Sequence, residues 1–89
     1  IVDKNTYFEW IHSNWVTTVK FFKDYLITSS KDGRIRIFDF KNKKLLGVFK
    51  CAENILSIDI AYEGEYLFVS TLKEVLQYKL KEMLEKIEN

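Results

Sequence analysis

Short runs of β-branched and aromatic residues, separated by polar turns, dominate the pattern of this chain. After residue 33, Ile35, Ile37 and Asp39 alternate with Arg34, Arg36 and Phe38, which is the period of a strand. Residues 15–22 have no cleanly polar face, so we expect that strand to be buried on both sides. The pattern predicts an all-β chain with strands at residues 6–11, 15–22, 25–30, 34–40, 45–49, 55–61, 66–71 and 75–80.

The pair Asp32 and Gly33 marks the clearest turn in the chain. An Asp-Gly pair between two strand-forming runs is typical of a β-hairpin, because Gly adopts a positive φ without a Cβ clash. We therefore predict a primed two-residue turn with Gly33 at positive φ. A second hairpin turn is expected at residues 72–74, which contain no Asp-Gly pair.

A weaker copy of this arrangement follows at a spacing of about 40 residues. The apolar positions of three segments recur in the same order, with 16–21 matching 55–60, 25–30 matching 66–71, and 35–38 matching 75–78. A period of this length with several short strands in each repeat is typical of the blades of a β-propeller.

The C-terminal residues 81–89 carry two conflicting signals. Four apolar residues follow the spacing of one helix face, namely Leu80, Met83, Leu84 and Ile87. The repeat predicts instead a strand equivalent to residues 45–49. We expect the strand, because packing against neighbours overrides local propensity, and the helix is the alternative.

Several polar residues of the first repeat lie in a recognisable order. His12 precedes the first strand of the repeat, Thr28 lies in the second strand, and Asp32 is in the turn. The next strand ends in the aromatic-Asp pair Phe38 and Asp39. This order resembles the WD-repeat β-propeller family, which has Gly-His, Ser/Thr, Asp and Trp-Asp at these places. The second repeat departs from the family at each place, with Cys51-Ala52, Val69, Lys73 and Tyr78-Lys79.

The resemblance implies a definite architecture. Two four-stranded antiparallel blades would span roughly residues 12–49 and 51–89, and residues 6–11 would form the outer strand of the preceding blade. Propellers use roughly four to eight blades, so two blades do not close a ring. The chain is then either a fragment of a larger propeller or a part that assembles with copies of itself. Its first expected partners are therefore other propeller blades.

The resemblance also implies roles for the polar residues. In the family a chain of hydrogen bonds links the turn Asp, the His, the Ser/Thr and the Trp. Here it would join Asp32, His12 and Thr28 and end there, because Phe38 has no indole N–H. A catalytic pair of His12 and Asp32 is the alternative, but the sequence marks no Ser or Cys nucleophile beside them.

Composition narrows the function. The chain has 14 Lys and Arg against 13 Asp and Glu, a net charge of +1, which gives no electrostatic footprint for nucleic acid. Cys51 is the only cysteine, which excludes an intrachain disulfide and favours an intracellular setting in cytoplasm or nucleus. One Cys and one His do not make a zinc site, and no apolar run approaches the roughly 18 residues of a membrane span. We expect no cofactor, no metal and no membrane.

We expect a protein-interaction scaffold that mediates assembly of a multiprotein complex. The sequence has no phosphate loop, metal cluster or paired-carboxylate motif, so we do not expect an enzyme. Propeller rims present loops to protein partners, and the candidate contacts are aromatic or charged residues near strand ends, namely Trp15, Lys31, Arg34 and Tyr62.

The alternative function is a subunit of an RNA- or DNA-associated complex. It would contact phosphate through basic residues of the rim, namely Arg34, Arg36, Lys41, Lys43 and Lys44. The balanced net charge speaks against this alternative.

Overall fold

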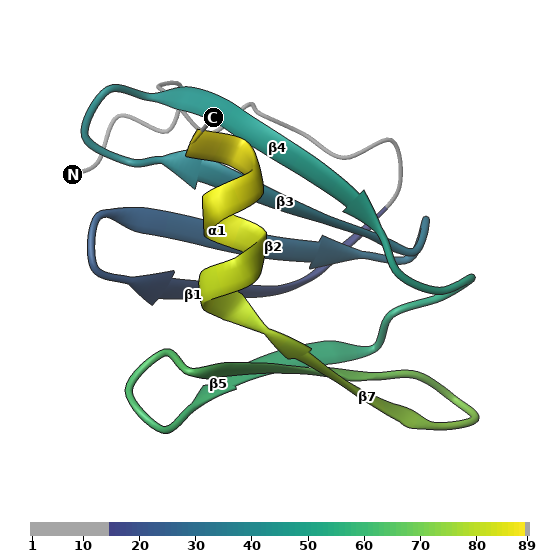
Figure 1. The fold of residues 1–89 in the computed structure, drawn as a ribbon. Coiled ribbons are helices and arrows are strands. Elements are labelled where there is room, and N and C mark those ends of the chain that lie inside the picture. Colours follow the sequence, from purple (N-terminus) through teal and green to yellow (C-terminus); the bar gives the residue numbers. More distant parts are fainter. Residues whose placement is uncertain (1–14, 89) are drawn as a thin grey trace, which may run out of the picture.

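A computed structural model describes residues 15–88, which form two antiparallel sheets and one helix (Figure 1). The first sheet has the order β1-β2-β3-β4, with strands Val16–Phe22, Tyr25–Ser30, Arg34–Asp39 and Lys44–Lys50. The second has the order β5-β6-β7, with strands Ser57–Ala61, Tyr66–Ser70 and Val75–Lys79, and α1 (Leu80–Glu88) follows it. The expected all-β fold is confirmed, while the expected strand at residues 6–11 lies outside the described residues.

The expected fourth strand of the second blade is wrong. Residues 80–88 form α1, so the second sheet has three strands among the described residues. The helical spacing of the four apolar residues decided the outcome, because Leu80, Met83 and Leu84 are all buried in the core between the two sheets. A strand would have turned alternate members of this set into water.

The two sheets pack face to face and close on each other at their first strands. β1 contacts β5, and the amine of Lys20 lies 3.5 Å from a carboxylate oxygen of Asp59. At the other side α1 contacts β4, β6 and β7, and it crosses the space between β4 and β7 (Figure 1). Ile87 of α1 packs directly on Gly47 of β4, where a Cβ would overlap its methyl group. The helix therefore fills the wedge between the two splayed sheets.

One continuous core lies between the sheets and under α1. It consists of Ile27, Ile35 and Ile37 from the first sheet, of Ile55, Ile58, Leu67 and Val69 from the second half of the chain, and of Leu80, Met83 and Leu84. Burying each such side chain contributes roughly 1.5–3 kcal/mol, so this interface holds the two sheets together as one unit.

The strand registers match the sequence repeat. Leu26 pairs with Phe38 in the first sheet, and Leu67 pairs with Tyr78 in the second. The equivalent residues Ile35 and Val75 differ in their surroundings, because Ile35 is 0% exposed against the second sheet and Val75 is 67% exposed. Each sheet is thus one repeat unit. Among the described residues, the face of the first sheet that carries Ile35 is covered by the second sheet, whereas no sheet covers the equivalent face of the second sheet, which carries Val75.

Two local expectations need correction. Gly33 has the expected positive φ of 83°, but Lys31 and Asp32 do not, so the turn is not of the primed two-residue type. The Gly33 N–H donates to the Ser30 carbonyl at 3.1 Å, which closes a four-residue turn that ends in a left-handed Gly. Strand β1 is not buried on both sides: Phe21, on the face turned away from the second sheet, is 59% exposed.

Candidate functional site at the rim that joins the blades

Three connections from both sheets gather at one end of the molecule (Figure 1). They are the β2–β3 turn, the connection from β4 to β5, and the β6–β7 turn. We call this surface the blade-joining rim and define it by Trp15, residues 31–34, residues 51–54 and residues 71–74. The β1–β2, β3–β4 and β5–β6 turns lie at the opposite end, which we call the opposite rim.

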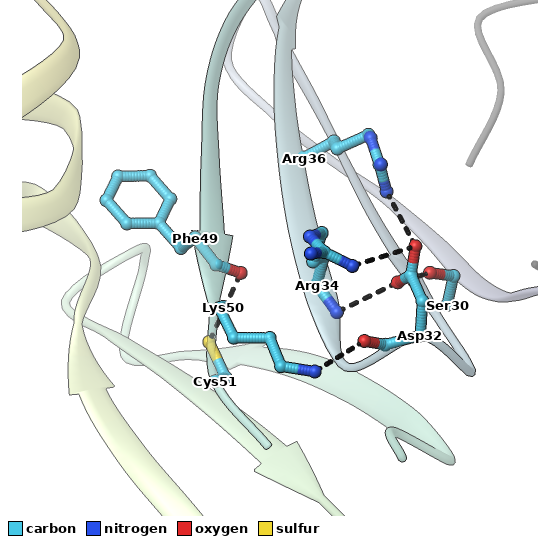
Figure 2. Close-up of polar contacts among 7 residues, drawn as sticks. All are labelled: Ser30, Asp32, Arg34, Arg36, Phe49, Lys50 and Cys51. Atoms are coloured by element: carbon cyan, nitrogen blue, oxygen red, sulfur yellow. Dashed lines mark hydrogen bonds and ion pairs between the residues drawn. The ribbon is translucent and has the colours of Figure 1, made fainter. Parts of the chain in front are cut away.

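Asp32 organises the first turn of the blade-joining rim (Figure 2). Its carboxylate accepts hydrogen bonds from the Ser30 hydroxyl and, at 3.0 Å, from the backbone N–H of Arg34. The guanidinium groups of Arg34 and Arg36 lie 3.7 and 3.5 Å from its second oxygen. Because the Asp32 side chain is only 9% exposed, these partners offset the cost of burying its charge.

Gly33 ties this turn to the connection between the blades. Its carbonyl accepts hydrogen bonds from the backbone N–H groups of Cys51 at 2.8 Å and Ala52 at 3.3 Å. A Cβ on Gly33 would overlap the Ala52 carbonyl oxygen, so no other residue permits this approach. The amine of Lys50 adds a hydrogen bond to the Asp32 carbonyl at 2.7 Å. The turn thereby fixes the path of the chain into the second blade.

The second turn of this rim, between β6 and β7, is built by Thr71 without an Asp-Gly pair. The Thr71 hydroxyl accepts hydrogen bonds from the backbone N–H groups of Lys73 at 3.2 Å and Glu74 at 3.1 Å. The Thr71 backbone N–H donates to the Glu74 carbonyl at 2.9 Å. A hydroxyl that bonds the backbone two and three residues ahead is a known turn signal, so Thr71 could have been recognised in the sequence.

A cleft of about 390 Å³ lies between these two parts of the rim. Its walls are mostly apolar and are formed by residues 51–54 on one side and residues 71–74 on the other. Leu72 at its edge is 79% exposed. The cleft offers a shallow site for an apolar side chain of a partner, with charged groups of Glu53, Lys73 and Glu74 around it.

The cysteine beside this cleft is half-buried. Burial raises the pKa of the Cys51 thiol, an effect that the neighbouring Tyr78 hydroxyl and Lys50 partly counter. Burial also raises the pKa of the Tyr78 phenol, and Cys51 adds to that rise. The thiol is therefore protonated at neutral pH and packs as a small apolar side chain.

Trp15 stands at the start of β1 on the same rim. Its side chain is 71% exposed, and the amine of Lys31 lies 4.3 Å from its ring centroid. The backbone N–H of Lys31 also donates to the Trp15 carbonyl at 2.9 Å. A cation–π contact of this kind restrains both side chains.

The structure brings together three of the four predicted partner contacts. Trp15, Lys31 and Arg34 share the blade-joining rim, whereas Tyr62 lies in the β5–β6 turn of the opposite rim. Tyr62 is 74% exposed and meets the ring of Tyr66 edge-on at 5.9 Å.

The predicted hydrogen-bond chain is only partly within the described residues. Thr28 is buried, and its neighbour Ser29 shares a hydrogen bond of 2.8 Å with the hydroxyl of Thr17. Asp32 meets the Ser30 hydroxyl and the Arg34 N–H, as described above. His12 lies outside the described residues, so the link from Asp32 through His12 to Thr28 stays a prediction.

The basic residues named for the nucleic-acid alternative do not share one surface. Arg34 and Arg36 are paired with the Asp32 carboxylate next to the blade-joining rim. Lys41, Lys43 and Lys44 lie around the β3–β4 turn at the opposite rim. There the Asp39 carboxylate accepts two hydrogen bonds from Asn42, and these lower the pKa of Asp39.

Two general features bear on the class of protein. Among residues 15–88 the nine-residue α1 is the only helix, and no helix there is long and apolar enough to span a bilayer. The same part of the chain has no group of three or more His, Cys, Asp or Glu side chains placed to hold a metal ion.

The arrangement of two repeat units packed face to face, closed at their first strands and splayed at their last, is that of neighbouring β-propeller blades. The profile of the TEP-1 C-terminal beta-propeller family matches residues 12–74, which is more than half of the chain. This chain therefore belongs to the TEP-1 C-terminal beta-propeller family. No curated protein is similar enough to this chain to count as a match.

Proposed function

We propose that this chain is a pair of WD-type propeller blades that binds a partner protein through the blade-joining rim. The observation that carries the proposal is the convergence of three connections, an exposed Trp15 and an apolar cleft on one rim. Binding of a partner, rather than catalysis, is the role we assign to the chain, as propeller membership suggests for an interaction module.

The chemistry of the rim supports protein recognition. Exposed Trp side chains are enriched among residues that dominate binding energy, because they bury much apolar area at a small entropic cost. Lys31 already restrains the Trp15 ring, which reduces the freedom lost when a partner binds. The hydrogen bonds of Asp32, Gly33 and Thr71 hold the neighbouring turns in place.

Further blades are the second class of partner that we propose. The face of the first sheet turned away from the core carries exposed apolar residues, namely Val19, Phe21, Leu45 and Val48. On the outer face of the second sheet Val75 is exposed at the position where Ile35 is covered. These blades come either from the rest of a longer chain or from copies of this one.

The WD-type assignment goes beyond the matched family and rests on the first repeat. A nearly buried Asp32 in the turn and an aromatic residue, Phe38, paired with Leu26 are consistent with it. In the second repeat Tyr78 pairs with Leu67 at the equivalent place. The role that we assign to His12 is to donate a hydrogen bond that joins Asp32 to Thr28.

The test compares two aromatic residues of similar exposure on opposite rims. Trp15→Ala and Tyr62→Ala are introduced separately into the full-length protein, and bound proteins are quantified after cross-linking and mass spectrometry. We expect Trp15→Ala to lose partners that Tyr62→Ala retains, by roughly tenfold or more, as for a central Trp in an interface. Equal partner sets in both variants and in the parent would contradict the proposal.

A further inference from the structure

Among the described residues the second sheet ends at its third strand, β7, whereas the first sheet continues with a fourth strand, β4. In the first sheet β4 pairs with the outer side of β3, but after β7 the chain turns into α1 and packs between the sheets (Figure 1). Within residues 15–88, β7 is the last strand of its sheet and no strand pairs with its outer edge.

The hydrogen bonds at both ends of β7 identify the backbone groups at this edge. Thr71 N–H donates to the Glu74 carbonyl at one end, and Leu80 N–H donates to the Glu65 carbonyl at 3.1 Å at the other. The β6–β7 register is regular between these pairs, so hydrogen-bonded pairs alternate with pairs that face outward. The residues whose N–H and C=O groups point away from β6 are Val75, Gln77 and Lys79.

This edge lacks the devices that protect the outer edge of the first blade. The β3–β4 pairing contains a register shift, and β4 begins and ends with lysines, Lys44 and Lys50. Bulges and charged residues on an edge discourage pairing with other strands. In contrast, β7 has no register shift and a single lysine, Lys79, at its end.

The cleft of the blade-joining rim lies at the start of this edge. In the first blade Arg36 of β3 pairs with Val48 of β4, and the residue equivalent to Arg36 in the second blade is Leu76. A strand added to β7 would place a side chain beside Leu76, on the core side of the sheet. Cys51 and Ala52, which line the cleft, pack against the same core together with Leu76.

We propose that the edge of β7 binds an extended segment of a partner protein as an antiparallel fourth strand. The backbone groups of Val75, Gln77 and Lys79 bind the segment, and a large apolar side chain opposite Leu76 enters the cleft. Addition of a strand to an exposed sheet edge is a general mode of peptide recognition, in which alternate side chains give specificity. This inference rests on the proposed function, because it names the form that one protein partner takes.

The test uses a displayed library of peptides with apolar residues at alternate positions, selected on the full-length protein. Gln77→Pro removes one outward N–H without removing a bond to β6, and Gln77→Val is the matched control that keeps this N–H. We expect selected peptides to lose about tenfold in affinity with Gln77→Pro, by the loss of a hydrogen bond in a desolvated site, and to tolerate Gln77→Val. Bound peptide slows amide hydrogen exchange at Val75, Gln77 and Lys79.

Several outcomes separate this inference from the proposed function. Peptides that lose affinity with Trp15→Ala but not with Gln77→Pro would support binding through the blade-joining rim and would refute addition of a strand to the edge of β7. Refutation also follows if no peptide is selected, or if the three outward amides are already protected without peptide because another segment or copy occupies the edge. Should Gln77→Pro unfold the protein, Val75→Pro at the first strand position replaces it, with exchange at Ile27 and Ile37 reporting the fold.

Discussion

The two blades of this chain differ in the residues that build their turns and in the element that follows their third strand. Among residues 15–88 the first blade has four strands and a turn built by Asp32 and Gly33, and the second has three strands and a turn built by Thr71. At the place of the fourth strand the second blade has α1, which packs back on Gly47 of the first blade. In this chain a helix thus stands where the repeat predicts a fourth strand, and it fills the wedge between the two sheets.

The largest expected effect comes from breaking α1. Glu85 is an exposed residue in the helix interior, and Glu85→Pro should destabilise the chain by about 3 kcal/mol or more, because it removes a helix hydrogen bond and clashes with the preceding turn. Glu85→Ala keeps the helix and should change the free energy of unfolding by less than about 0.5 kcal/mol. Urea denaturation measures both. Equal midpoints for the two variants would mean that α1 does not hold the blades together.

Gly33 should be the most sensitive residue of the first turn. Gly33→Ala places a Cβ against the Ala52 carbonyl at a positive φ, which should cost about 2–3 kcal/mol. Lys31→Ala, in the same turn but at negative φ, is the control for the turn sequence. Thermal denaturation of both variants checks this. A Gly33→Ala protein as stable as the control would show that the turn and the blade connection do not approach closely.

Removal of Asp32 should cost about 2 kcal/mol, since it removes the acceptor of the Arg34 backbone N–H and the carboxylate that two guanidinium groups approach. The double variant Asp32→Ala with His12→Ala tests the WD-type hydrogen-bond chain. If His12 bonds to Asp32, the two losses are not additive in urea denaturation. If the two losses of stability add strictly, His12 does not belong to the hydrogen-bond chain, and the account of the Asp32 turn still stands.

The equivalent change in the second blade should be milder. Thr71→Ala removes hydrogen bonds from a neutral hydroxyl to the backbone in an exposed turn, so we expect a loss of about 1 kcal/mol. Thr71→Ser retains the hydroxyl and should restore most of it. If Thr71→Ala were as costly as Asp32→Ala, the two turns would not differ as described.

Alkaline pH gives the smallest effect. The pKa values of the Cys51 thiol and the Tyr78 phenol are both raised by burial, so the fold favours their neutral forms. The resulting stability is complete below the ordinary thiol pKa of 9.0 and is lost as pH rises through the higher values of the folded protein. Thiolate absorbance during a titration should give a Cys51 midpoint above 9.0. A midpoint at or below that value would show that the Cys51 thiol is exposed to water and would contradict its burial.

The local parts of this fold could be predicted from the sequence, and the long-range parts could not. Alternating side chains predicted the strands, and the Asp-Gly pair predicted a left-handed Gly33. The helix at residues 80–88 was only the alternative prediction, because the repeat favoured a strand over the helical spacing of Leu80, Met83 and Leu84. The approach of Lys50 to the Asp32 carbonyl joins residues far apart in the chain and leaves no local signal.

In the candidate site, too, the local features could be predicted from the sequence and the long-range ones could not. Trp15, Lys31 and Arg34 were named as aromatic or charged residues near strand ends, but only the fold separates them from Tyr62. The cleft arises where residues 51–54 meet residues 71–74, and its walls come from connections that no motif marks. Pairing of sheets across the core decides which connections share a rim, and this is not a local property of the chain.

The central claim is that these are two neighbouring blades whose outer faces need further blades. Sedimentation of the isolated 89-residue chain at micromolar concentration tests it most directly. Exposed Phe21 on one outer face and exposed Val75 on the other predict association that increases with concentration, since water penalises such apolar surface at roughly 25 cal/mol per Å². A single, cooperatively unfolding monomer over the whole concentration range would contradict the claim.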